Sequence, residues 1–323
     1  MQYLSFSESK GATPVAIVRG DFSAKQGKVV YLSENKPTTN EKLELDYTVV
    51  SKKIKGKDRD KTAIISKISK GLRNGLSSEF LISEGTEVRD IYDRLQKDGS
   101  NGQILNIAQG SQFEVLPTID QHKRDCIFIT GCSGSGKSWW VKKFAENYNK
   151  VWEQKRPIYL ISKLEEDSTL DNAQCKINRI NLESLITKPL DINEKEMENC
   201  LVIFDDFDTL ENTKEKPLLK TVQKLIDDCL IMGRHLNISV CVISHYTSNY
   251  KASRIILIES TKIVVYPHAC SAHALKYLLG THVGIDAQEI KNIKKLGSRW
   301  VCFDRNYPQV MYSETQVKLL NSE

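Results

Sequence analysis

The pattern of hydrophobic and polar positions changes near residue 120. From there, short apolar segments alternate with longer stretches in which apolar residues recur every three or four positions. This alternation is typical of a mostly parallel β-sheet covered by helices, so we predict one α/β domain over residues 113–323. The expected strands are 126–131, 157–162, 200–206, 238–245, 262–267 and 299–304, and the expected helices are 138–150, 215–232, 252–259, 271–282 and 286–295.

The first part of the chain has a different pattern. Its apolar segments are short and strand-like, and clusters of Gly, Asn, Ser and Lys separate them. We therefore predict a smaller, β-rich domain of unknown role over residues 1–112. The expected strands are 14–20, 28–33, 45–50, 80–83 and 112–116. Residues 51–73 carry nine Lys or Arg against two Asp, which indicates either a solvated surface loop or a segment that contacts phosphates.

Composition narrows the class of protein. A chain of 323 residues with 40% hydrophobic residues can bury a core, and a net charge of +5 permits a polyanionic partner without requiring one. Eight scattered cysteines with no C-x-x-C pair indicate reduced core residues in a cytosol-like compartment. We expect no membrane span and no signal peptide, because no long apolar run occurs and the N-terminus lacks a basic start with an apolar centre.

Residues 131–138 read GCSGSGKS and lie between a predicted strand and a predicted helix. In this context the pattern G-x-x-x-x-G-K-[ST] predicts a phosphate-binding loop, because glycines let successive N–H groups converge on a phosphate at a helix N-terminus. Lys137 would reach the β- and γ-phosphates, and the hydroxyl of Ser138 would bind Mg²⁺. The alternative is a glycine–serine turn that binds nothing. The predicted nucleotide contacts are Gly131, Cys132, Ser133, Gly134, Ser135, Gly136, Lys137 and Ser138.

A pair of acidic residues follows the predicted strand 200–206. We expect Asp205 to hold the metal through water and Asp206 to act as the general base that takes a proton from the attacking water. Neighbouring side chains of a strand point to opposite faces, so both acids reach one site only if the strand ends at them. A helix N-cap or a surface turn is the alternative role of this pair.

Two candidate residues lie at opposite ends of the predicted strand 238–245. His245 stands at its tip, where a polar side chain can contact the γ-phosphate or the attacking water. Arg234 precedes the strand, at the far edge of the sheet, from where it can reach only the nucleotide of a neighbouring subunit in a ring. It is a candidate for a trans-acting arginine finger. The alternative for Arg234 is an ion pair with Asp227 or Asp228 at the end of a helix.

Several ordered motifs together resemble a known family. They are FITGCSGSGKS, LVIFDD, GRHLNISVCVISHYTSNYKASRIILIES, IVVYPHACS, KYLLGTHVGID and SRWVCFDRNYPQVMYSE, and they span about residues 113–314. Their combination resembles the DNA-packaging ATPases of nucleocytoplasmic large DNA viruses, within the FtsK/HerA superfamily of P-loop NTPases. Many superfamily members have Gln where this chain has His245, although the viral branch also has His there.

The resemblance implies a RecA-like P-loop NTPase core that uses ATP and Mg²⁺. It further implies a homo-oligomeric ring of five or six subunits, an arginine finger at Arg234, and pumping of double-stranded DNA into a viral capsid. The other partner would be a capsid or portal-vertex protein, and the protein would act in the host cytoplasm or with the virion. The alternatives are another P-loop DNA translocase or helicase, a nucleotide-gated DNA- or capsid-binding module with little turnover, and a small-molecule kinase.

Weaker candidates remain among the basic and aromatic residues. Arg254 and Arg299 occupy motif-like positions, but each is also consistent with a structural ion pair, for example Arg254 with Glu259 or Arg299 with Asp304. The aromatic pair Trp139 and Trp140 is more typical of core packing than of stacking on adenine. A basic cluster of Lys291, Lys294, Lys295 and Arg299 suits either a DNA channel or a solvated helix face.

Overall fold

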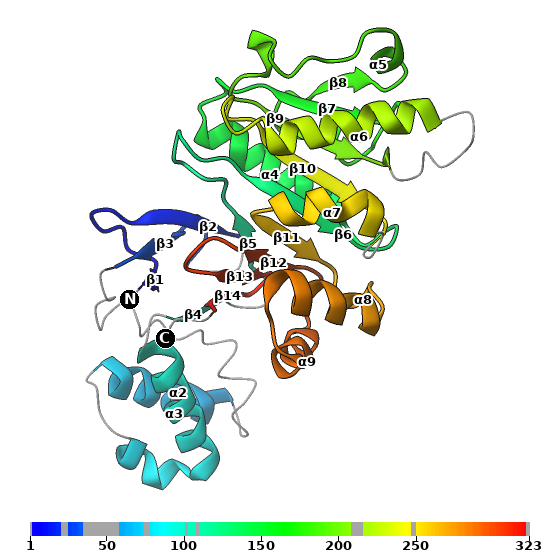
Figure 1. Cartoon of the computed structure of the whole chain (residues 1–323). Coiled ribbons are helices and arrows are strands. Elements are labelled where there is room, and N and C mark those ends of the chain that lie inside the picture. Colours follow the sequence, from blue (N-terminus) through cyan, green and yellow to red (C-terminus); the bar gives the residue numbers. More distant parts are fainter. Residues whose placement is uncertain are drawn as a thin grey trace. The chain divides into compact units, whose positions relative to one another are not determined.

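The structure is a computed structural model that describes residues 2–20, 25–34, 58–73, 78–100, 103–107, 110–207, 216–246 and 250–320 (Figure 1). The chain divides into two units, Met1–Val115 with Pro308–Glu323, and Leu116–Tyr307. The expected domain boundary between residues 112 and 113 lies close to the first division. The return of the last residues to the first unit was not expected from the sequence. No helix among the described residues is long and apolar enough to cross a lipid bilayer.

The second unit contains a mostly parallel sheet. Its strand order is β12-β11-β6-β10-β9-β7-β8, and only β12 runs antiparallel to its neighbour in this unit. The strands are β6 (Cys126–Thr130), β7 (Ile158–Ser162), β8 (Asn178–Asn181), β9 (Leu201–Asp205), β10 (Ser239–Ser244), β11 (Lys262–Val265) and β12 (Val301–Asp304). Every residue of β6, β9, β10 and β11 is buried, which explains their continuous apolar sequences. The predicted strands of this domain and its α/β class are confirmed.

Helices cover this sheet and follow the predicted pattern. They are α4 (Lys137–Val151), α5 (Ser184–Thr187), α6 (Lys216–Ile231), α7 (Tyr250–Glu259), α8 (Ala272–Tyr277) and α9 (Ala287–Lys295), with a 3-10 turn, η3 (Lys195–Met197), and a π-helical turn, η5 (Leu278–Val283). Both α4 and α6 pack against β10. Side-chain caps stabilise the first turns of α8 and α9. Ser271 accepts a hydrogen bond from the N–H of Ala274, and Asp286 accepts one from the N–H of Glu289.

The cysteines behave as core residues. All eight are free thiols, and those at 126, 200, 229, 241 and 302 are buried. Burial raises the pKa of Cys126 to about 11 and that of Cys200 to about 12, so these thiols stay neutral. The expectation of reduced cysteines that pack as small hydrophobic residues is therefore confirmed for these positions.

The first unit combines antiparallel strands with helices. One sheet has the order β1-β3-β2-β5, formed by β1 (Tyr3–Ser5), β3 (Val29–Ser33), β2 (Thr13–Arg19) and β5 (Gln112–Val115). A second group pairs β4 (Ile104–Asn106) with β14 (Gln316–Leu319), and β14 with β13 (Val310–Ser313). The helices are α2 (Asp58–Arg73), a 3-10 segment η2 (Ser78–Glu84) and α3 (Thr86–Ser100).

Two expectations for the first unit were wrong. Residues 80–83, expected as a strand, lie in the 3-10 segment η2, and residues 58–73 of the expected charged loop form helix α2. The physical reason is a small core between the helices, made by Ile65, Ile68, Leu81, Val88, Ile91 and Tyr92. Ile65 and Ile68 lie one turn apart, which is helical spacing hidden among the lysines. The expected strand 45–50 and residues 51–57 lie outside the described residues.

A buried ionic cluster links Lys262, at the amino end of β11, to Asp125 and Asp304. The ammonium of Lys262 lies 2.5 Å from a carboxylate oxygen of Asp125 and 3.0 Å from one of Asp304. The side chains of Lys262 and Asp125 are only 6% and 1% exposed, so neither charge is solvated by bulk water. The other oxygen of Asp125 accepts a hydrogen bond from the N–H of Thr118. Lys262 therefore compensates charge that the fold has already buried.

We expect Lys262→Met to lower the free energy of unfolding by about 3–5 kcal/mol, because it leaves Asp125 buried without a cation. Chemical denaturation measures this loss. Lys155→Ala is the matched control, since Lys155 pairs with Glu153 where both side chains are exposed, and its midpoint should stay at the wild-type value. Equal midpoints for the two variants would contradict the role of Lys262.

Candidate nucleotide-binding site

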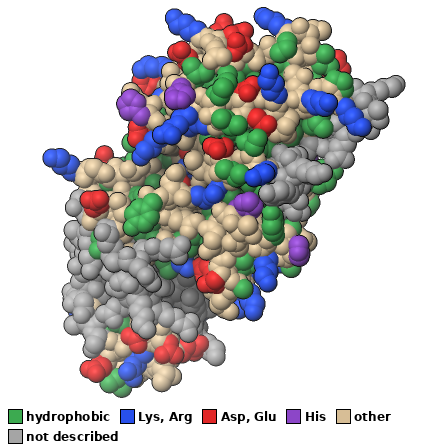
Figure 2. All heavy atoms as spheres, viewed as in Figure 1, with side chains coloured by type: hydrophobic (Ala, Val, Ile, Leu, Met, Phe, Trp, Pro, Cys, Tyr) green, Lys and Arg blue, Asp and Glu red, His purple; other side chains and the backbone are tan. Residues whose placement is uncertain are grey.

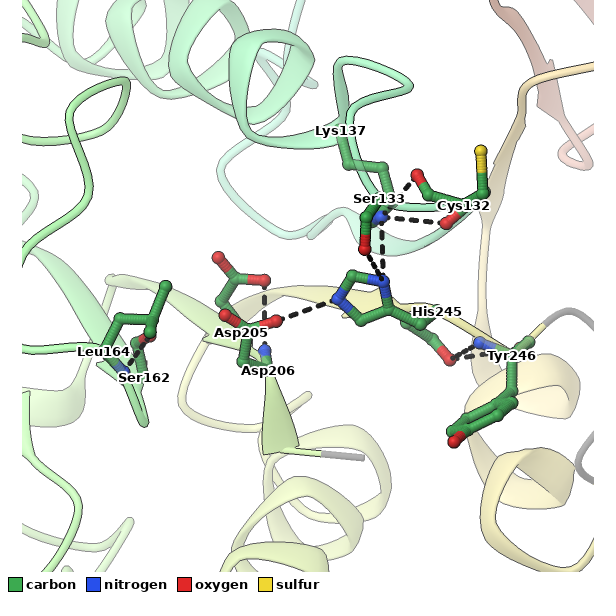
Figure 3. A network of polar contacts seen from close by, with 11 residues as sticks. Cys132, Ser133, Lys137, Ser162, Leu164, Asp205, Asp206, His245 and Tyr246 are labelled. Carbon is green, nitrogen blue, oxygen red and sulfur yellow. Dashed lines mark hydrogen bonds and ion pairs between the residues drawn. The ribbon is translucent and has the colours of Figure 1, made fainter. Parts of the chain in front are cut away.

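The predicted site residues other than Arg234 meet at the carboxyl ends of three neighbouring strands, β6, β10 and β9. Figure 3 shows Lys137, Asp205, Asp206 and His245 turned toward one another at this edge. Strand β10 lies between the other two, with Ser244 opposite Thr130 of β6 and Val242 opposite Phe204 of β9. The carboxyl edge of a parallel sheet is where ligands bind in α/β proteins.

The loop after β6 has the conformation that a phosphate-binding loop needs. Gly134 and Gly136 have φ angles of 75° and 106°, in the left-handed region that side chains disfavour. Gly136 is the N-cap of α4, and the helix starts at Lys137. The loop therefore leads directly into a helix N-terminus, whose first N–H groups lack acceptors within the helix and can bind an anion. Ser138 lies in this first turn and is partly exposed.

Lys137 lies across this loop. Its side chain is buried, and its ammonium donates to the carbonyl oxygens of Gly131 at 2.8 Å and Cys132 at 3.1 Å. The same nitrogen lies 3.4 Å from Nδ1 of His245. The positive charge is thus held between the loop and the tip of β10.

The backbone at the acidic pair brings both carboxylates to one place. Strand β9 ends at Asp205, and Asp206 has a φ of 56°, in the left-handed region. The N–H of Asp206 donates to a carboxylate oxygen of Asp205 at 3.0 Å. A non-glycine residue in this conformation costs about 1–3 kcal/mol and persists only where the surroundings hold it. The strand therefore ends at the pair, which is the condition for both acids to reach one site.

The electrostatics of Asp205 suit a cation. Burial raises its pKa to about 7, and the negative charges of Asp206 and Asp167 act in the same direction. The N–H of Asp206 and the charge of Lys137 oppose this rise only in part. The ionised carboxylate is therefore costly here, and a bound cation would remove that cost.

The oxygen atoms available fit Mg²⁺. This ion prefers hard oxygen ligands, and it usually takes one or two from the protein and the rest from water and phosphates. The Ser138 hydroxyl and the Asp205 carboxylate, direct or through water, are donors of this kind. No cluster of three or more His, Cys, Asp or Glu residues that could hold a metal occurs in the part of the chain that the structure describes. The donor set thus suits a metal that arrives with a nucleotide.

His245 connects the acidic pair to the loop. Its Nε2 lies 2.9 Å from a carboxylate oxygen of Asp206, and its Nδ1 lies 3.3 Å from the hydroxyl of Ser133. The ammonium of Lys137 can only donate, so Nδ1 accepts from it and the proton of a neutral ring sits on Nε2, donating to Asp206. The hydroxyl of Ser244 bonds both the N–H and the carbonyl of Tyr246, which fixes the strand tip.

Arg234 lies at the other end of the sheet. It is exposed in the turn between α6 and β10, and among the described residues it forms no ion pair with Asp227 or Asp228. A different arginine, Arg124, satisfies the end of α6: it donates to the carbonyl of Cys229 at 2.5 Å and to that of Leu230. The alternative role for Arg234 at the helix terminus is therefore not found.

The structure also places residues that the sequence analysis missed or left open. Ser162 ends β7 directly opposite Asp205 and is buried, with its hydroxyl accepting from the N–H of Leu164. Nothing in the sequence distinguished this serine from other strand ends. Trp140 is buried and stacks on Phe144, so it is a core residue as expected, whereas Trp139 is partly exposed near Lys143.

Comparison with known proteins gives a relative of similar sequence. No known family model matches the sequence. The uncharacterized protein V3 of Sputnik virophage is 31% identical over 213 residues, which cover 64% of this chain and 81% of the virophage protein. This chain belongs to the family of Sputnik protein V3. Since V3 is uncharacterized, the relation brings no activity with it.

Solved structures with low sequence identity to this V3 family member include the following two. The DNA-packaging ATPase B204 of Sulfolobus turreted icosahedral virus is 16% identical, with a TM-score of 0.41, over 59% of this chain and 96% of B204. The pCW3 conjugation coupling protein TcpA is 11% identical, also with a TM-score of 0.41, over 94% of this chain and 77% of TcpA.

The raised pKa of Asp205 leads to a pH-dependent stability. Between the ordinary carboxyl pKa of 3.8 and about 7, the unfolded state ionises while the folded state keeps the proton, so stability falls as the pH rises, and above about pH 7 the full cost is present. Asp205→Asn removes this cost. We expect its stability advantage over the wild type to grow by about 2 kcal/mol between pH 5.5 and pH 8.

Urea denaturation in buffer without Mg²⁺ or nucleotide measures this difference. A wild-type-like stability of Asp205→Asn at both pH values, or an advantage that does not change with pH, would contradict the buried, proton-binding carboxyl.

Proposed function

We propose that this protein is an ATP-hydrolysing motor that moves double-stranded DNA and packages a viral genome into its capsid. The observation that supports it most is the continuous polar connection from the loop 131–138 through Lys137 and His245 to Asp206. The imidazole of His245 thus contacts side chains of the loop on one edge and, on the other, the carboxylate that can activate water (Figure 3).

The chemistry assigned to each residue follows from its place. Loop amides and Lys137 bind the phosphates, and Ser138 with Asp205 would hold Mg²⁺, which supplies charge to the leaving phosphates. Asp206 accepts the proton as water attacks the γ-phosphorus. His245 contacts both Asp206 and Lys137, so it is suited to report whether a γ-phosphate is present.

Arg234 is proposed to complete the site of a neighbouring subunit. It lies at the amino end of β10, whereas His245 lies at the carboxyl end of the same strand, so Arg234 cannot serve its own nucleotide. Its exposure and the absence of an ion pair with Asp227 or Asp228 in the described residues support a role between subunits. The arrangement requires a closed homo-oligomer, for which the motifs imply five or six subunits.

The choice of DNA and capsid as partners rests on the motif resemblance. On the face of the second unit seen in Figure 2, basic and acidic side chains are interspersed. A grip on phosphates would make movement independent of base sequence and sensitive to salt. The proposed sites of action are the host cytoplasm and the virion, and the proposed docking partner is a capsid or portal-vertex protein.

Three rivals make different predictions. Another P-loop translocase or helicase would hydrolyse ATP with DNA but would need no capsid, and a helicase would separate strands. A nucleotide-gated binding module would bind ATP with negligible turnover that DNA does not raise. A small-molecule kinase would pass the phosphoryl group to an acceptor without DNA, a role that the paired acids suit less well than attack by water.

The proposal is tested by the ATPase rate of the purified full chain with and without duplex DNA. We expect DNA to stimulate the wild type, Lys137→Ala to lose activity, and Asp206→Asn to lose about 10²–10⁴-fold in kcat. Asn tolerates the left-handed backbone at this position, so Asp206→Asn removes the base without forcing a new turn. Arg234→Ala should lose about 10³-fold or more.

Mixing subunits separates a shared site from a self-contained one. A Lys137→Ala subunit still offers Arg234, and an Arg234→Ala subunit still binds nucleotide, so mixed rings should regain part of the activity that each variant lacks. Failure to regain activity in assemblies shown to be mixed would contradict the finger assignment. ATP turnover that duplex DNA leaves unchanged would contradict the motor.

A further inference from the structure

The loop 131–138 has two sides, because β6 lies between β10 and β11 in the sheet. The β10 side carries His245, and beyond it Asp205 and Asp206 of β9. The groups proposed for attack on the γ-phosphate are therefore all on this side. None of the residues proposed for hydrolysis lies on the β11 side.

Tyr266 and Arg299 lie against the loop on the β11 side. Tyr266 directly follows β11, and Arg299 shortly precedes β12. A Cβ atom placed on Gly136 would lie 3.1 Å from Nη2 of Arg299 and 3.7 Å from Cε1 of Tyr266. The guanidinium thus lies beside the loop at Gly136, directly before Lys137.

The backbone around Arg299 is fixed to the helix that follows the loop. The ring of the buried Trp300 meets that of Trp140 of α4 edge to face, with centroids 6.1 Å apart. The buried hydroxyl of Ser298 donates to the carbonyl of Trp300 at 2.6 Å. Arg299, between these two residues, is exposed. A charged side chain is therefore presented at the loop from an anchored backbone.

The alternative ion pair of Arg299 with Asp304 is ruled out by register. Strands β11 and β12 are antiparallel, with Val265 opposite Val301 and Lys262 opposite Asp304. Asp304 therefore lies at the amino end of β11, bonded to Lys262 at 3.0 Å, while Arg299 lies near the carboxyl end. Arg299 is positioned for the loop rather than for the base of the sheet.

The direction of a bound nucleotide follows from the two sides. If the γ-phosphate faces Asp206 and His245, the phosphate chain crosses the loop and its nucleoside end leaves toward β11. The α-phosphate then comes closest to the residues beside Gly136. A guanidinium there can bind it with charge-assisted hydrogen bonds.

We propose that Arg299 binds the α-phosphate of the nucleotide in its own subunit, and that it is a binding residue distinct from Arg234 of the neighbour. This inference rests on the proposed nucleotide site and goes beyond it. Because ATP and ADP share the α-phosphate, Arg299 should contribute equally to the affinity for both.

The test is calorimetric titration of the full chain with Mg²⁺–ATPγS and with Mg²⁺–ADP. We expect Arg299→Ala to weaken both by about tenfold, and Arg299→Lys to retain part of the affinity. Lys291→Ala removes an equal charge from an exposed position on α9 and is the matched control, with wild-type affinity expected.

The outcomes separate this inference from the function. If a folded Arg299→Ala protein binds both nucleotides with wild-type affinity, or loses affinity only for ATPγS, the α-phosphate contact is overturned. Neither result contradicts the proposed motor function. A loss for Lys291→Ala as large as for Arg299→Ala shows a general charge effect and also overturns it. Absence of binding by the wild type overturns both proposals.

Discussion

The site depends on the parallel register of β6, β10 and β9, which brings three chemically different strand ends to one edge of the sheet. Thr130 pairs with Ser244, and Phe204 with Val242, so the loop, the histidine and the acids start from neighbouring positions. This register is set by residues buried on both faces of the sheet. Apolar packing in the sheet thus brings together polar groups that are far apart in the sequence.

The charges at this edge of the sheet determine which ligand the site can bind. Two carboxylates lie at the end of β9, and the pKa of Asp205 is raised to about 7 because it is buried beside other acids. Lys137 and His245 are the nearby groups that bring positive charge or a proton to them. The proposed magnesium nucleotide would bring a cation to Asp205 and a polyanion to Lys137, so it would match the charges on both sides of the site.

Much of this could be predicted from the sequence, because local patterns carried it. The strands of the second unit are buried apolar segments and were correctly expected. The loop GCSGSGKS lies, as expected, between a strand and a helix, with Gly134 and Gly136 at positive φ, and its binding of phosphate stays a prediction. Helix α2 was missed because its lysines masked an apolar face that packs against η2 and α3. The left-handed turn at Asp206, the cap that Arg124 gives to α6, and the position of Arg299 beside Gly136 depend on long-range contacts. No local pattern contains that information.

An experimental structure of the protein with Mg²⁺ and ATPγS would show directly whether a nucleotide binds at residues 131–138. We expect the terminal thiophosphate to lie between Lys137 and Asp206. We expect Mg²⁺ to lie about 2.0–2.1 Å from the Ser138 hydroxyl, with Asp205 in reach directly or through water. A nucleotide bound away from residues 131–138, or one whose terminal phosphate lies remote from Asp206, would contradict the proposed site.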